Sequence, residues 1–220
     1  MVSRRTVRAI AALLGLTLLA GLGYALRWRS NPSPCPYAQR HAINFPRPVI
    51  TRSRLRDVLK PQPGERLLEV GPGTGYYTGM VARAIEPSGR LHAVDVQSEM
   101  VEHVRTRMRQ EGNPNVEPIR GDARSLPYPD DTFDAAYLVL VLGEIPDQER
   151  ALDELERVLK PDGRLVIGES LPDPHFVGFE GLRRRVERRG LAFDARVGTR
   201  VGYFTRFDAG ISDRSADSVE

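Results

Sequence analysis

The stretch Leu67-Leu68-Glu69-Val70-Gly71-Pro72-Gly73-Thr74-Gly75 joins an apolar run to a turn of three alternating glycines. Residues 76–85 follow with a helix-compatible pattern, and residues 90–95 carry a second short apolar run that ends on Asp95. Together they have about the 30 residues expected of a strand, loop, helix and strand that cross over in parallel. The sequence therefore predicts a parallel α/β sheet organised around this turn.

Two acidic residues flank the glycine turn and indicate what it binds. The spacing Gly-x-Gly-x-Gly differs from the Gly-x-Gly-x-x-Gly of dinucleotide dehydrogenases. Glu69 would repel a pyrophosphate and attract a cation, and Asp95 suits a pair of ribose hydroxyls. An adenosine ligand with a positively charged amino-acid tail, S-adenosyl-L-methionine, satisfies both acids, whereas a glycine-rich surface turn without a ligand is the alternative.

Further motifs follow in order along the chain. They are Glu69–Gly75, Gly121-Asp122-Ala123, Leu126–Asp134 and Leu155–Leu165. Together they resemble the class I S-adenosylmethionine-dependent methyltransferases, and most closely the branch with quinone-biosynthesis and small-molecule methyltransferases. The resemblance covers about residues 48–206. It implies a Rossmann-like, doubly wound α/β sheet of seven strands that ends in an antiparallel C-terminal hairpin.

The resemblance also implies which residues bind the cofactor, S-adenosyl-L-methionine. Glu69 and the glycines would hold its methionine part, Asp95 the ribose hydroxyls, Val96 and Asp122 with its neighbour the adenine, and the backbone of Leu138 would lie near the sulfonium. The complete expected set is Glu69, Gly71, Gly73, Gly75, Asp95, Val96, Asp122, Ala123 and Leu138. No metal site is expected, because the chain has one cysteine, Cys35.

The methyl acceptor is less well specified. Candidate catalytic residues are Glu144, His41 and Tyr76. Many family members carry a pair of histidines after the fourth strand, where this chain has Gly143-Glu144, so proton transfer by histidine is not expected there. We expect methyl transfer to a small hydrophobic or lipid-like acceptor. A non-catalytic cofactor-binding membrane protein and a dinucleotide-linked oxidoreductase remain as alternatives.

Residues 9–26 form an uncharged apolar run between arginines. Eighteen helical residues would span about 27 Å, which predicts a transmembrane helix and a single-pass membrane protein with a cytosolic catalytic domain. A cleaved signal peptide and a buried helix are the alternatives. The predicted organisation is an anchor or signal segment over 1–29, a Pro-rich linker and lip over 30–48, the methyltransferase domain over 49–208 and a disordered tail over 209–220.

Composition and periodicity supply the rest of the outline. The net charge of +3 in 220 residues does not call for nucleic acid as a partner, and the oligomeric state is left open.

Helix 179–189 holds five arginines, which indicates either a solvated face or contact with anionic lipid. The remaining predicted helices are 49–59, 76–85, 98–110 and 147–159, and the predicted strands are 67–70, 91–94, 116–120, 133–142, 164–167, 191–196 and 200–207, the last two joined by a turn at Gly198.

Overall fold

Seven strands form one sheet in the computed structural model, which describes residues 15–17, 19–21, 23, 32–39, 48–171 and 173–210. The chain divides into two units, residues 1–32 and 33–220, and the whole sheet belongs to the second. The boundaries predicted at residues 29, 48 and 208 stay predictions.

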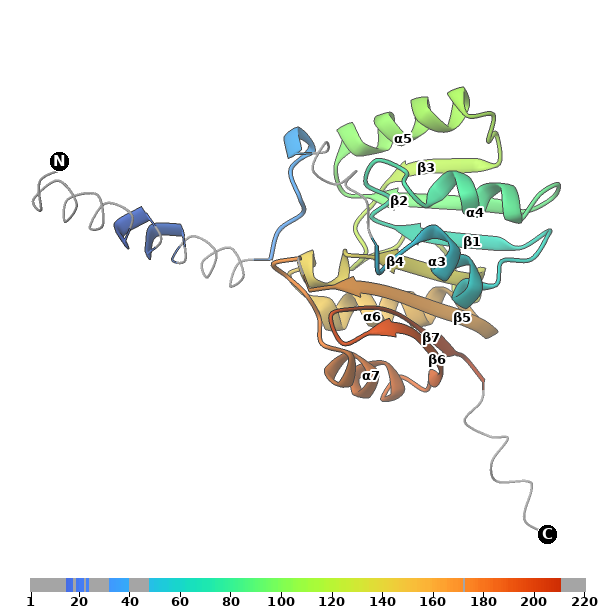
Figure 1. The fold of residues 1–220 in the computed structure, drawn as a ribbon. Helices are drawn as coiled ribbons and strands as arrows, with labels where there is room; N and C mark the ends of the chain where they lie inside the picture. Colours follow the sequence, from blue (N-terminus) through green and yellow to red (C-terminus); the bar gives the residue numbers. More distant parts are fainter. Residues whose placement is uncertain are drawn as a thin grey trace, which may run out of the picture. The chain divides into compact units, whose positions relative to one another are not determined.

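The strand order is β3-β2-β1-β4-β5-β7-β6 (Figure 1). The first five strands run parallel, while β7 pairs antiparallel with both β5 and β6. This confirms the predicted Rossmann-like sheet with a C-terminal antiparallel hairpin. The strands are β1 (Arg66–Val70), β2 (Arg90–Asp95), β3 (Val116–Arg120), β4 (Phe133–Val139), β5 (Leu159–Ser170), β6 (Ala192–Thr199) and β7 (Gly202–Asp208).

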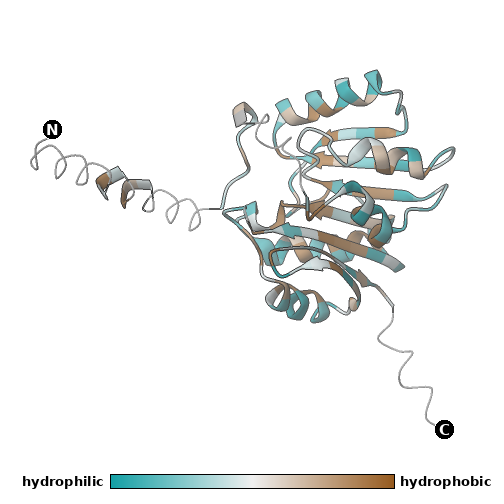
Figure 2. Ribbon diagram, in the orientation of Figure 1, coloured by the Kyte–Doolittle hydropathy of each residue, from teal (hydrophilic) through white to brown (hydrophobic). Residues whose placement is uncertain are grey.

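Helices cover both faces of the sheet, so its central strands are buried on both sides. Along β1, Leu68 and Val70 pack in one apolar layer with α6 and α7, and Leu67 packs in the other with α3, α4 and α5. Figure 2 shows the hydrophobic colouring concentrated in the strands and the outer faces of the helices hydrophilic. The helices are α3 (Arg52–Leu59), α4 (Thr78–Ala84), α5 (Ser98–Gln110), α6 (Gln148–Val158) and α7 (Phe179–Glu187), with short 3-10 turns η1 (Tyr37–Gln39) and η2 (Leu142–Glu144).

Local side chains define where two of these helices begin. Thr51 precedes α3 and its hydroxyl accepts a hydrogen bond from the Arg54 N–H at 3.3 Å. Asp147 precedes α6 and its carboxylate accepts one from the Arg150 N–H at 3.1 Å. Both are N-caps, which satisfy backbone donors that the first helical turn leaves unpaired.

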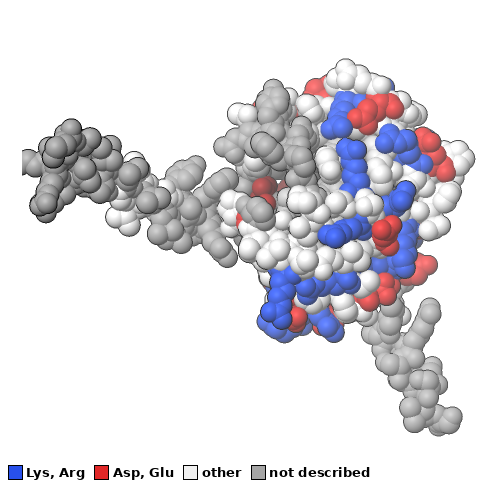
Figure 3. All heavy atoms as spheres, viewed as in Figure 1, with Lys and Arg blue, Asp and Glu red and all other residues white. Residues whose placement is uncertain are grey.

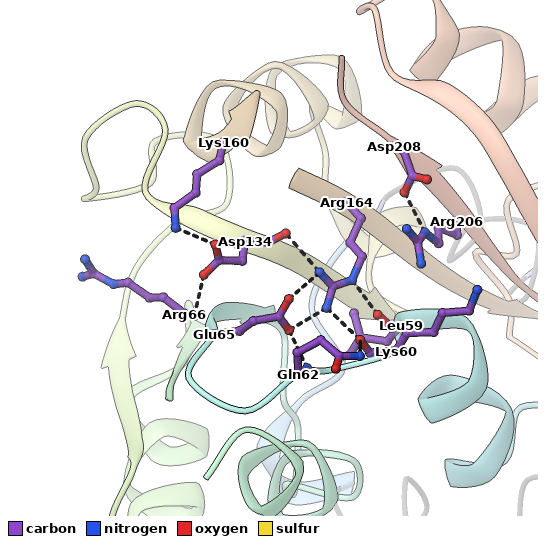
Figure 4. Close-up of polar contacts among 10 residues, drawn as sticks. All are labelled: Leu59, Lys60, Gln62, Glu65, Arg66, Asp134, Lys160, Arg164, Arg206 and Asp208. Carbon is purple, nitrogen blue, oxygen red and sulfur yellow. Dashed lines mark hydrogen bonds and ion pairs between the residues drawn. The ribbon is translucent and has the colours of Figure 1, made fainter. Parts of the chain in front are cut away.

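A buried arginine ties together the amino ends of the central strands (Figure 4). Arg164 of β5 is 8% exposed. Its guanidinium donates to both carboxylate oxygens of Glu65, at 2.8 and 2.7 Å, and to the backbone oxygens of Leu59 and Lys60. This network joins the end of α3 and the start of β1 to β5, at the edge of the sheet opposite the glycine turn.

The hairpin turn lies slightly later than predicted. Thr199 pairs with Gly202, so Arg200 and Val201 form the turn and Gly198 belongs to β6. Gly198 is needed there because it has a φ of 122° and a Cβ would lie 2.4 Å from the Gly202 carbonyl oxygen. A close approach of two strands, and not a reversal of the chain, explains this glycine.

The predicted membrane span is corrected by the structure. Among the residues that the structure describes, no helix combines the length and apolar character needed to cross a bilayer. A span needs about 20 residues of continuous helix, whereas the helical residues described between 9 and 26 are 15–17, 19–21 and 23. The prediction of a transmembrane helix, and of the single-pass membrane location that depended on it, is therefore wrong, although the rest of this range lies outside the described residues.

Two arginines in or next to α7 form ion pairs with the neighbouring helix α6. Arg185 contacts Glu149 of α6, and Arg189 contacts both Glu149 and Asp153. Arg184 and Arg188 are exposed. These ion pairs join α6 to α7 and to Arg189, which follows it. The two interpretations drawn from the sequence, a solvated face and contact with anionic lipid, stay predictions.

Candidate active site

The glycine turn after β1 has a backbone that only glycine adopts easily. Gly71, Gly73 and Gly75 have φ values of 65°, 55° and 79°, a left-handed region in which a Cβ is disfavoured. The Gly71 N–H donates to the Val94 carbonyl oxygen at 2.8 Å, which holds the turn against β2. A Cβ on Gly71 would lie 2.4 Å from Cγ2 of Val141, in the loop after β4. The turn is thus packed closely between the ends of β2 and β4.

The two acids that the sequence singles out are both buried beside this turn. Glu69 is 3% exposed and Asp95 is 8% exposed. Burial raises the pKa of Glu69 to about 7, although the Thr78 hydroxyl, which donates to its Oε2 at 2.6 Å, opposes the rise. Burial also raises the pKa of Asp95, against the backbone N–H of Gln97 at 2.9 Å from its Oδ1. Burial disfavours the ionised form of both carboxyls, and a cationic ligand bound beside them would favour that form.

The other predicted cofactor residues differ in how available they are. Val96 is 43% exposed, immediately after Asp95. The Asp122 carboxylate pairs with the guanidinium of Arg124, which lowers the pKa of Asp122. Ala123 and Leu138 are buried in the apolar layer that faces α6. The predicted contact of the Leu138 backbone with the cofactor stays a prediction.

Of the three acceptor-side candidates, Glu144 is the best placed. It ends η2, three residues after Val141, and burial raises its pKa to about 8. Tyr76 lies after the glycine turn, with the Arg52 guanidinium 4.3 Å from its ring centroid. His41 lies outside the described residues.

Residues 33–39 lie along the edge formed by the carboxyl ends of β2 and β4. The Cys35 N–H donates to Glu144 Oε2 at 3.1 Å, and the Cys35 oxygen accepts from the Gln97 side chain at 2.9 Å. The Tyr37 N–H donates to Gln97 Oε1 at 3.1 Å. The sequence predicted a lip in this region but not its contacts with Gln97, which no local pattern distinguishes from a surface glutamine.

Glu169 was also missed, although the sequence carries a signal for it. It follows the apolar run Leu165–Gly168, just as Asp95 follows the run of β2, and the carboxyl ends of parallel strands share one edge of a sheet. Glu169 is 1% exposed. Figure 3 shows acidic atoms in the recess where Figure 1 places this edge, while basic atoms gather over α7.

These side chains fit S-adenosyl-L-methionine as a ligand. The tight glycine turn leaves no Cβ beside the bound molecule, and the acids that surround it match the positive charge of a sulfonium and an ammonium. A pyrophosphate would meet buried carboxyls on both sides of the turn. The geometry therefore favours this cofactor over a dinucleotide.

Comparison with known proteins agrees with this assignment. Residues 68–167 match the family model "Methyltransferase domain". The chain is 34% identical over 140 residues to the demethylmenaquinone methyltransferase of Anoxybacillus flavithermus, covering 64% of this chain and 59% of that protein. It is also 34% identical over 158 residues to the ubiquinone/menaquinone biosynthesis C-methyltransferase UbiE of Cronobacter sakazakii, covering 71% of this chain and 59% of that protein. The chain thus spans about three fifths of the length of these relatives.

A solved structure is similar over most of the chain. It is a SAM-dependent methyltransferase from Aquifex aeolicus, with a TM-score of 0.69 and 25% sequence identity, covering 80% of this chain and 99% of the other. These matches indicate the same kind of protein as the sheet topology, the glycine turn and the buried acids do. Residues 68–167 therefore form a domain of the class I S-adenosylmethionine-dependent methyltransferase type, whose cofactor is S-adenosyl-L-methionine.

Proposed function

We propose that this protein transfers a methyl group from S-adenosyl-L-methionine to a small hydrophobic acceptor of the quinone-precursor type. The observation that carries the proposal is the pair of buried acids, Glu69 and Asp95, on either side of a glycine turn that admits no Cβ. The relatives from Anoxybacillus flavithermus and Cronobacter sakazakii are methyltransferases of menaquinone or ubiquinone biosynthesis, which supports a quinone-type acceptor.

Each cofactor-binding residue has a proposed role. Glu69 and the backbone of Gly71, Gly73 and Gly75 hold the methionine part, and Asp95 accepts hydrogen bonds from the ribose hydroxyls. Val96, Asp122 and Ala123 surround the adenine, and the Leu138 backbone lies beside the sulfonium. The bound cofactor supplies an already activated methyl group, so the protein contributes mainly orientation of the acceptor and exclusion of water. Residues 33–39, whose backbone bonds to Gln97 and Glu144, are suited to exclude water at this edge.

The experiment that tests this function uses the full-length protein and methyl-labelled S-adenosyl-L-methionine. The acceptor probe is demethylmenaquinone reduced to its hydroquinone. We expect label to appear in the extracted quinone. Tight binding of the cofactor with no transfer to this probe, or to fractionated lipid and small-molecule extract, would instead favour a non-catalytic cofactor-binding protein.

Replacing Asp95 with alanine is expected to weaken cofactor binding by about 1–3 kcal/mol, because hydrogen bonds to the ribose are lost. Glu69→Ala should also weaken it, through loss of a buried negative charge near the cationic tail. Titration calorimetry measures both effects. Glu99→Ala, which removes an exposed carboxylate from the first turn of α5, serves as the control and should bind normally. Unchanged affinity in both Asp95→Ala and Glu69→Ala would contradict the proposed pocket.

A further inference from the structure

A second set of buried carboxyls lies beside the cofactor residues, at the carboxyl ends of β4 and β5. Glu169 is the next-to-last residue of β5, and its Oε2 accepts a hydrogen bond from the Val177 N–H at 3.2 Å. Its Oε1 is fully buried and has no hydrogen-bond partner among the residues that the structure describes. An unpaired buried carboxylate oxygen is costly. Glu169 therefore either holds a proton or faces a ligand.

Glu144 shares this environment. Burial is the main cause that raises the pKa of both Glu144 and Glu169 to about 8, and repulsion by Glu144 contributes to the rise at Glu169. Asp173, in the loop after β5, adds to the repulsion on each. The other charged or titratable groups that face Glu144 are Asp95 of β2 and the Cys35 thiol, and Tyr203 of β7 faces Glu169. Among the residues that the structure describes, these neighbouring groups include no cation that would favour the ionised carboxyls, so both glutamates hold protons at neutral pH.

Close packing fixes Glu144 relative to the loop that follows β5. A Cβ on Gly143 would lie 1.8 Å from the His175 carbonyl oxygen, so η2 is in direct backbone contact with residues 173–177. Two residues earlier, Val141 packs against Gly71 of the cofactor turn. One loop therefore contacts both the cofactor turn and the segment that contacts Glu169. Glu144 therefore lies on the loop that packs against the proposed cofactor turn.

The backbone of Cys35 fixes one oxygen of the Glu144 carboxyl. Oε2 accepts the Cys35 N–H at 3.1 Å, which orients the carboxyl. The side chain as a whole remains partly exposed at the edge of the sheet. A carboxyl that is oriented by the backbone, partly accessible and next to a buried acid has the arrangement of a proton acceptor.

We propose that Glu144 accepts the proton that a phenolic or enolic acceptor releases on methylation, and that Glu169 is a positioning residue that holds the shared second proton. This deepens the proposed function and rests on it. The acceptor O–H bond breaks and its proton goes to the Glu144 carboxylate. The oxygen electron pair, directly or through the conjugated ring, forms the new bond to the methyl carbon. The S–CH₃ bond breaks with its electron pair kept by sulfur, so neutral S-adenosylhomocysteine leaves and one proton is released for each methyl transferred.

A phenolic acceptor matches this base better than a strongly acidic one. A phenol has a pKa of about 10, and a base that titrates one or two units lower can take its proton within a bound complex. The demethylmenaquinone hydroquinone has such hydroxyls, so it is the probe for the test.

The test measures kcat for the full-length protein between pH 6 and 9.5 with this hydroquinone and labelled cofactor. For the unmodified protein we expect kcat to rise with pH around a midpoint near 8, because deprotonated Glu144 is the active form. Glu144→Gln should lower kcat at pH 8 by about 100-fold or more and leave the affinity for S-adenosyl-L-methionine within about threefold. Glu144→Asp should recover part of the rate and keep the rising profile.

Glu169→Gln tests whether Glu169 holds the second proton. It replaces the protonated carboxyl with a neutral amide of the same shape, so the midpoint of the kcat profile should stay near that of the unmodified protein. Glu99→Gln on α5 should leave the profile unchanged. Calorimetric binding of the cofactor by each variant shows that its domain is folded. If Glu144→Gln does not fold, the pH profiles of the unmodified protein and of Glu144→Asp test the role of Glu144 as proton acceptor.

The outcomes distinguish a failure of the roles proposed for Glu144 and Glu169 from a failure of the proposed methyltransferase function. No transfer to the hydroquinone at any pH would overturn both. Transfer with a flat pH profile, or with normal turnover in Glu144→Gln, would overturn the role of Glu144 and leave the methyltransferase function intact. A midpoint that moves to lower pH by a unit or more in Glu169→Gln would overturn the proposal that Glu169 holds a proton.

Discussion

Replacing Arg164 with methionine is expected to lower the free energy of unfolding by about 3–5 kcal/mol, because it leaves the largely buried carboxylate of Glu65 without its cation. Glu65 would lose both of its contacts with the guanidinium, and the backbone oxygens of Leu59 and Lys60 would lose a donor. Methionine keeps much of the apolar volume, so the loss reports the polar network and not a cavity. Urea unfolding followed by circular dichroism measures the change.

The matched control is Arg184→Met on α7, which removes the same groups from an exposed position. It should change the free energy of unfolding by no more than about 0.5 kcal/mol. The double variant Arg164→Met with Glu65→Met should be more stable than the single variant, since it removes the unpaired charge as well. Equal stability of Arg164→Met and Arg184→Met would show that the network in Figure 4 contributes little.

Replacing Gly71 with alanine is expected to cost about 2–5 kcal/mol, divided between stability and cofactor affinity. The left-handed backbone at φ 65° costs an alanine roughly 1–2 kcal/mol. The contact of 2.4 Å with Val141 adds roughly 1–3 kcal/mol of overpacking unless the turn moves. Because the turn holds the methionine part of the cofactor in the proposed site, calorimetry should show greatly weakened binding.

Gly112 separates these two contributions. It has a φ of 71°, and a Cβ there would meet nothing within 4 Å. Gly112→Ala should therefore lose only the backbone contribution and bind the cofactor normally. Adding Val141→Ala to Gly71→Ala should recover part of the lost affinity by removing the collision. The packing explanation fails if Gly71→Ala and Gly112→Ala behave alike.

Local patterns in the sequence were sufficient for most of the fold. The bounds predicted for α5 and β3, residues 98–110 and 116–120, agree with the structure. In α5, the apolar residues recur at helical spacing, and Met100, Val104 and Met108 are buried together. The glycine turn and its two acids could also be predicted, because a parallel crossover brings the ends of β1 and β2 to one edge of the sheet.

Predictions from local sequence patterns were wrong where the structure of a segment depends on residues outside it. The apolar run 9–26 has about the number of residues that a helix needs to cross a bilayer. That number does not show whether one continuous helix forms, and the described helices contradict the span. Gly198 carried the composition of a turn, yet it lies in β6 because the Gly202 backbone approaches it closely. In both cases the decisive fact concerns the wider structure and not the segment itself.

The sequence by itself determined the parallel sheet, the cofactor turn and the acids Glu69 and Asp95, since each follows from periodicity or from the end of a strand. Only the tertiary structure decided that Cys35 orients Glu144, which is 109 residues away, and that Arg164 binds the Leu59 backbone across 105 residues. It also decided that Glu169 lies near enough to Glu144 for repulsion between the two carboxyls to help raise the pKa of Glu169. Contacts between residues so far apart leave no periodic trace in the chain, because they depend on which strands become neighbours and on which backbones touch.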